Sequence, residues 1–104
     1  MNSHYEIKGS NLIIYVPKDL DHHVAKEIQQ NVDSMIDAYG IRQVIFDFEE
    51  TEFMDSSGIG VLLGRCRKMH FLNGKVKASN LQNHRVRKIF SMAGLYQLLE
   101  VEEA

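Results

Sequence analysis

The residues best suited to chemistry form a short polar turn, Asp55-Ser56-Ser57-Gly58, that comes just before a helical pattern. A helix N-terminus offers unpaired backbone N–H groups and about half a positive charge. Such a terminus can cap a serine oxygen, and it can equally hold a phosphate. The turn therefore predicts a phosphate-compatible site at the start of this helix.

The helix that follows the turn carries three glycines, each of which costs about 1 kcal/mol relative to alanine in a helix interior. One helical face holds Gly60, Val61, Gly64, Arg65 and Lys68. The opposite face holds Ile59, Leu62, Leu63 and Cys66. Glycines on the first face would leave a flat surface for a partner protein. Alternatively, they allow close packing against another helix of the same fold.

Other arrangements favour neither catalysis nor a metal. Ser56 lacks the Gly-x-Ser-x-Gly setting of a nucleophile elbow, and no oxyanion motif is visible. His22 and His23 are adjacent at a helix start, so we expect their side chains to point apart. The acidic run between Asp47 and Glu52 lacks the spacing of a calcium loop. We therefore predict no enzyme activity, no metal and no cofactor.

The composition favours one domain spanning residues 1–104. The chain has 104 residues, a formal net charge of −2 and a single cysteine, so it requires no oxidising compartment. No apolar run approaches the roughly 20 residues of a membrane span, and the first residues lack the layout of a signal peptide. We expect a cytoplasmic monomer, with neither nucleic acid nor membrane among its partners.

The apolar pattern predicts strands that alternate with helices. The expected strands lie at 5–8, 12–16, 44–48, 75–79 and 98–101, with a loop over 49–54. The expected helices follow the N-cap Asp21 as far as Tyr39, cover 57–71, and surround Val86 to Phe90 before a stop near Gly94. This order predicts an α/β fold with a small, mostly parallel sheet, an N-terminal hairpin and helices packed against it. Sites in such sheets form beyond the carboxyl ends of the strands.

Four segments, in order, resemble the STAS domain, a family named for sulphate transporters and anti-sigma factor antagonists. Phe53 to Arg65 resembles the family signature, and Val44 to Phe48 occupies the place of its central strand. Leu20-Asp21-His22-His23 resembles the loop before the first helix in sporulation members, and Ser91 to Leu95 resembles a helix end of the family. The resemblance runs from about Tyr5 to Val101.

This resemblance implies a regulatory function. The unphosphorylated antagonist binds an anti-sigma factor that is also a serine kinase, which releases the sigma factor. The kinase then phosphorylates the serine after the aspartate, here Ser56, and a serine phosphatase reverses the step. The predicted partner-binding residues are Asp21, His22, Asp55, Ser56, Ser57, Gly58, Gly60, Val61, Gly64 and Arg65.

Several alternatives remain open from the sequence. General-stress antagonists would carry a similar serine turn, so the pathway depends on the loop at Leu20 to His23. That loop follows Pro17, where the family commonly has a glycine nearby, which alters the turn. A nucleotide-binding or weakly nucleotide-hydrolysing domain is a second hypothesis, although no Walker-type loop is present. A non-switching STAS adaptor is a third, although it would not need Ser56.

Overall fold

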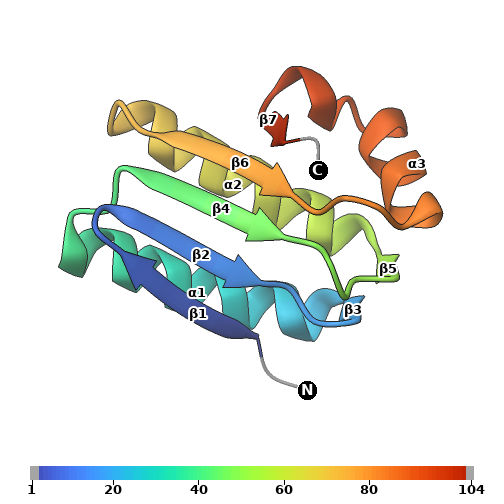
Figure 1. The fold of residues 1–104 in the computed structure, drawn as a ribbon, viewed down its shortest axis with the longest axis horizontal. Helices are drawn as coiled ribbons and strands as arrows, with labels where there is room; N and C mark the ends of the chain where they lie inside the picture. The colour runs from blue at the N-terminus through green and yellow to red at the C-terminus, as the bar shows by residue number, and fades with distance from the viewer. Residues whose placement is uncertain (1–2, 103–104) are drawn as a thin grey trace.

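The computed structural model describes residues 3–102, and its main element is a five-stranded mixed sheet (Figure 1). The strands are β1 (His4–Lys8), β2 (Asn11–Tyr15), β4 (Gln43–Asp47), β6 (Lys75–Ser79) and β7 (Glu100–Glu102). Their spatial order is β1-β2-β4-β6-β7, with β1 antiparallel to β2 and the remaining pairs parallel. The predicted mostly parallel sheet with an N-terminal hairpin is confirmed.

Two helices, α1 (His22–Tyr39) and α2 (Ser56–Phe71), pack side by side on one face of the sheet (Figure 1). The core lies between them and alternate residues of the strands, such as Leu12, Val44 and Phe46, all fully buried. The third helix, α3 (His84–Met92), and a 3₁₀ turn, η1 (Leu95–Gln97), precede β7. Phe90 of α3 meets Phe48 edge to face, with ring centroids 5.4 Å apart, so α3 is anchored where β4 ends.

The structure corrects the sequence prediction at two places. Part of the expected loop over 49–54 is a strand, β5 (Phe53–Met54), which pairs in parallel with β3 (Asp19–Leu20). Both strands are too short to show a hydrophobic period. The last strand begins at Glu100 and not at Leu98, because Leu99 turns into the core before the strand starts.

The β3–β5 pair brings the beginning of α2 very close to Leu20 and Met54. Gly58 is buried there, and a Cβ atom at this position would collide with Met54 and would lie 3.0 Å from Leu20. By contrast, a Cβ atom at Gly60 or Gly64 would meet no atom within 4 Å. Only the first of these helix glycines is therefore required by packing within the fold.

This difference predicts opposite effects of alanine within one helix. Gly58→Ala should lower the free energy of unfolding by about 1–3 kcal/mol, because the added methyl group overpacks the contact. Gly60→Ala should raise it by about 0.5–1 kcal/mol, because alanine is the better helix former and the space is open. Urea denaturation followed by circular dichroism measures both. A stabilising Gly58→Ala would contradict the close approach.

Candidate functional site

The candidate site lies where α1 and α2 begin, beside the small β3–β5 sheet. The Asp55 N–H donates to the carbonyl of Leu20 at 3.3 Å, and this bond ties the two helix starts together. His22 and Ser56 are the first residues of α1 and α2, so they occupy equivalent positions on neighbouring helices. The structure thus places the predicted residues Asp21, His22, Asp55 and Ser56 at one end of the molecule.

Asp55 is the N-cap of α2. Its Oδ1 accepts from the N–H of Ser57 at 2.8 Å and from the N–H of Gly58 at 3.3 Å. These N–H groups are therefore already occupied, and they are not free to hold a phosphate as the turn alone suggested. Ser56 follows the cap with an exposed side chain, whereas Ser57 is half-buried. Of the two serines, Ser56 is the more accessible to another protein.

Asp21 caps α1 in the same way, as predicted. Its Oδ1 accepts from the N–H of Val24 at 3.0 Å. This backbone bond lowers the pKa of the Asp21 carboxyl, so the group stays charged to a lower pH than a free aspartate. His22 is exposed, and its ring lies 4.0 Å from that of His23. The expectation that these two rings point apart is therefore wrong, although no group of three metal-ligating side chains is found among residues 3–102.

The predicted flat face of α2 separates into an exposed strip and a buried strip. Ser56 and Gly60 are exposed, and Gly64 is half-buried one turn further along. No side chain covers the space beside either glycine. The alternative that these two glycines pack against another helix of the fold does not hold, and their role in partner binding stays a prediction.

Val61 and Arg65 lie on the buried strip, so their assignment to an open partner surface is wrong for this structure. Val61 is 4% exposed and Arg65 is 6% exposed. Gly58 is buried too, against Leu20 and Met54. Sequence spacing placed Val61 and Arg65 with the glycines because it could not show that α1 covers that side of α2.

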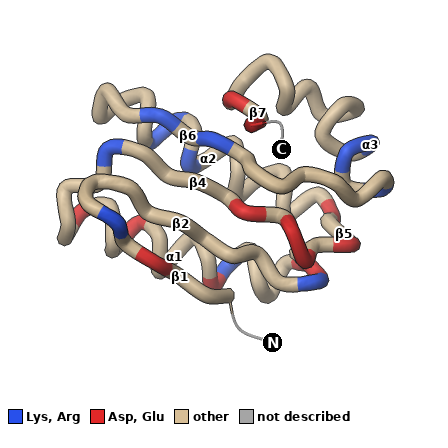
Figure 2. Tube along the Cα trace, viewed as in Figure 1, with Lys and Arg blue, Asp and Glu red and all other residues tan. Residues whose placement is uncertain are grey.

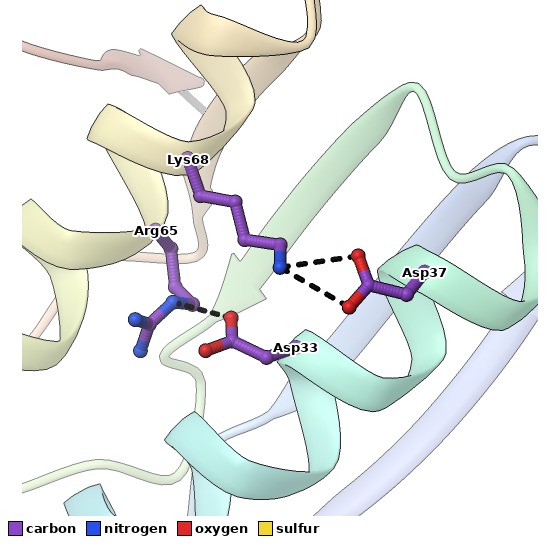
Figure 3. A network of polar contacts seen from close by, with 4 residues as sticks. All are labelled: Asp33, Asp37, Arg65 and Lys68. Atoms are coloured by element: carbon purple, nitrogen blue, oxygen red, sulfur yellow. Dashed lines mark hydrogen bonds and ion pairs between the residues drawn. The ribbon is translucent and has the colours of Figure 1, made fainter.

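Arg65 joins α2 to α1 through an ion pair with Asp33, next to the pair of Lys68 with Asp37 (Figure 3). The Arg65 Nε lies 3.0 Å from the Asp33 Oδ1, but its N–H does not point at that oxygen, so the attraction is chiefly ionic. Burial lowers the pKa of the Arg65 guanidinium, and the Asp33 charge opposes this shift. The pair ties α2 to α1 beneath the exposed glycine strip.

An apolar groove of about 340 Å³ opens beside Ser56. Met54, Asp55, Ser56 and Ile59 line one side, and Ile89, Met92 and Ala93 of α3 line the other. Met92 is 78% exposed, which is unusual for a large apolar side chain. No local sequence pattern indicates this groove; the one signal in the sequence is Met92, which lies outside the apolar face formed by Val86, Ile89 and Phe90.

Comparison with known proteins agrees with this architecture. The model of the STAS domain matches residues 2–104. The chain belongs to the STAS domain family. An anti-sigma F factor antagonist of Lysinibacillus sphaericus is 32% identical over 89 residues, which cover 86% of this chain and 75% of that protein. An anti-sigma-B factor antagonist of Listeria monocytogenes is 24% identical over 108 residues, covering 98% of this chain and 90% of that protein.

Two solved structures of SpoIIAA share the fold of this STAS chain. The anti-sigma factor antagonist SpoIIAA in its unphosphorylated form has a TM-score of 0.80 at 27% sequence identity. The matched region covers 98% of this chain and 88% of the SpoIIAA chain. The Bacillus cell fate determinant SpoIIAA in the phosphorylated form has a TM-score of 0.78 at 28% sequence identity, and the match covers 97% of this chain and 91% of that chain. Among the residues described, no helix of this STAS domain is long and apolar enough to cross a membrane.

The buried ion pair predicts unequal effects of two neighbouring aspartates. Asp33→Ala should lower the free energy of unfolding by about 2 kcal/mol, because it leaves the Arg65 charge buried without its partner. Asp37→Ala is the matched control, since Asp37 is 68% exposed and its pair with Lys68 should contribute less than about 1 kcal/mol. Thermal and urea unfolding of both variants measure the difference. Equal losses would show that the Arg65 pair is solvated.

Proposed function

We propose that this STAS domain is an anti-sigma factor antagonist of the sporulation type. Its unphosphorylated form would bind an anti-sigma serine kinase in the cytoplasm and release the sigma factor, and phosphorylation of Ser56 would end that binding. A serine phosphatase would restore it. The observation that carries the proposal is the exposed Ser56 at a capped helix start, beside an apolar groove.

The relatives support the same assignment. The anti-sigma F factor antagonist of Lysinibacillus sphaericus is more similar in sequence than the anti-sigma-B factor antagonist of Listeria monocytogenes. This difference favours the sporulation type over general stress. The related structures include SpoIIAA in both unphosphorylated and phosphorylated forms, which supports a fold that tolerates the phosphate.

The capped helix start explains how a phosphate could act on binding and not on folding. A phosphate on Ser56 adds about −1.5 to −2 charge at neutral pH. The side chain is exposed, so the added group needs no room inside the core. The N–H groups of Ser57 and Gly58 already bind Asp55, so they are not free to hold the phosphate, whose charge would remain beside the groove. An apolar segment entering the groove would then have to desolvate that charge, which opposes docking.

The partner surface that this geometry supports differs from the one expected from sequence. It comprises Ser56, the exposed backbone at Gly60 and Gly64, and the groove lined by Ile59 and Met92. Val61 and Arg65 would hold α2 in place by packing on its buried side, without contacting the partner. Asp21 and Asp55 would contribute chiefly by holding the two helix starts in place, with His22 exposed at the edge.

Ser56 variants test the switch. Incubation with the cognate anti-sigma kinase and ATP should add one phosphate to the wild-type chain and none to Ser56→Ala. Intact mass followed by peptide mapping measures this. Ser56→Asp should fold normally but bind the kinase more weakly, because it places a charge beside the groove. Ser57→Ala is the matched control and should still be phosphorylated.

Three results would contradict the proposal. A phosphate that maps to another residue would remove Ser56 from the switch. Absence of phosphate with a folded chain and an active kinase would instead favour a non-switching adaptor. Ser56→Asp protein that is unfolded by circular dichroism would contradict the claim that the phosphate acts only at the surface.

The groove predicts a second, separate loss of binding. Met92→Asp should weaken kinase binding at least about tenfold, because a carboxylate replaces an apolar side chain that the partner would cover. Phe71→Asp is the matched control, since Phe71 is 86% exposed but lies at the other end of α2. Calorimetric titration with the unmodified kinase measures both. Equal affinities of the two variants would exclude the groove from the interface.

A further inference from the structure

The end of the molecule opposite Ser56 carries an exposed apolar surface that the proposed function does not use. Parallel strands bring the turn from α1 to β4 and the turn from α2 to β6 to the same end of the sheet (Figure 1). Tyr39, the last residue of α1, is 64% exposed, and Phe71 and Leu72, at the end of α2, are 86% and 47% exposed. Soluble domains rarely gather such side chains without a partner.

Each of these turns also supplies a cation at the start of the next strand. Arg42 precedes β4, and Lys75 begins β6. The Lys75 N–H donates to the Arg42 carbonyl at 3.0 Å, so the two residues lie side by side. Both side chains are exposed, and neither makes an ion pair within residues 3–102. We call this surface the basic–aromatic rim; it comprises Tyr39, Arg42, Phe71, Leu72 and Lys75.

The turns that form the rim are held in defined conformations. Gly40 has a left-handed backbone with φ +60°, and Asn73 has φ 60°. A Cβ atom at Gly74 would lie 2.5 Å from a methyl carbon of Met69 and 2.7 Å from the Arg42 carbonyl oxygen. The second turn therefore packs tightly against the first, and the aromatic side chains project from a rigid base.

The overall net charge conceals this arrangement. Figure 2 shows Lys and Arg where β4 and β6 begin, and Asp and Glu near β5 and the end of β4. Lys8 and Lys68 are paired with Glu6 and Asp37 respectively, whereas Arg67, one helical turn before Phe71, is exposed and has no ion pair within residues 3–102. The positive charge of the rim itself comes from Arg42 and Lys75, and Arg67 adds to it from α2. The formal charge of −2 is a sum over the whole chain, so it does not reveal this local excess of cations.

In contrast to the expectation from the sequence that no membrane is among the partners, we propose that the basic–aromatic rim binds the surface of an anionic lipid bilayer. Exposed aromatic and leucine side chains can enter the headgroup region, while adjacent Lys and Arg attract anionic lipids. Since no helix among the described residues can span a bilayer, this contact is peripheral. The Ser56 end points away from the rim along the sheet, so a bound molecule would keep its kinase-binding surface in water.

A second copy of the chain fits the rim less well. A two-fold contact would bring the rim of one copy against the rim of another. Arg42 and Lys75 would then face like charges, which is unfavourable. An anionic bilayer instead offers negative headgroups for Arg42 and Lys75. It also offers an apolar layer that the exposed aromatic and leucine side chains can enter.

A tryptophan probe tests where the molecule touches the bilayer. The chain contains no tryptophan, so Phe71→Trp introduces a single tryptophan at the rim, whose emission can be excited selectively over that of the tyrosines. Its emission should shift to shorter wavelength with vesicles of equal parts phosphatidylglycerol and phosphatidylcholine, and not with phosphatidylcholine alone. Met92→Trp is the matched probe at the Ser56 end, with 78% exposure of the native side chain, and should show no shift. A shift of the Met92→Trp emission, or of neither probe, would overturn the proposal.

Charge reversal provides an independent test by vesicle co-sedimentation. Arg42→Glu with Lys75→Glu should weaken partition onto the anionic vesicles by at least about fivefold per position, and salt should weaken wild-type partition as well. Arg87→Glu with Lys88→Glu changes the net charge equally on α3 and should leave partition within about twofold of wild type. Equal losses in the two double variants would overturn the rim as the contact. Failure of the wild-type chain to sediment with anionic vesicles would also overturn the proposal, and would favour an acidic protein as the ligand of this surface.

Discussion

The close approach of two helix starts is the constraint on which the rest of this structure depends. The β3–β5 pair connects segments that are far apart in the chain, and the Asp55 N–H bond to Leu20 sets α2 beside α1. This approach is possible only because Gly58 has no side chain facing Met54 and Leu20. Once the start of α2 is held there, the side of this helix that faces α1 is fixed. Arg65 turns towards α1, while Ser56 and Gly60 remain exposed.

The same constraint separates the residues that hold the fold from Ser56 within one short motif. Asp55 satisfies the N–H groups of the first helical turn, and Gly58 permits the packing. Ser56 stands between them and takes part in neither task, so it is free to carry a different role. Gly60 and Gly64 lower helix stability without a packing reason inside the fold. A surface kept bare at this cost is consistent with a partner that presses closely against the helix.

A mostly parallel sheet gives this small domain two chemically different ends. The turns after the strands contain the capped helix starts, acidic side chains and the groove, whereas the turns before the strands carry exposed aromatic residues beside unpaired cations. The five-residue strands between them span about 16 Å, which exceeds the screening length of about 8–10 Å at physiological salt. The two ends can therefore act on different partners with little electrostatic coupling.

The sequence by itself determined the order of the main elements, the cap at Asp21, and the location of the serine turn, whereas the structure assigned the cap of α2 to Asp55. These features depend on local rules: hydrophobic period, capping side chains and glycine stops, which are visible within a few residues. Only the tertiary structure decided which side of α2 is covered, and it assigned Val61 and Arg65 to the interior. It also decided that Ile59 and Met92 share a groove, and that Arg42 and Lys75 are neighbours. Each of these depends on contacts between residues distant in the chain, which no local pattern encodes.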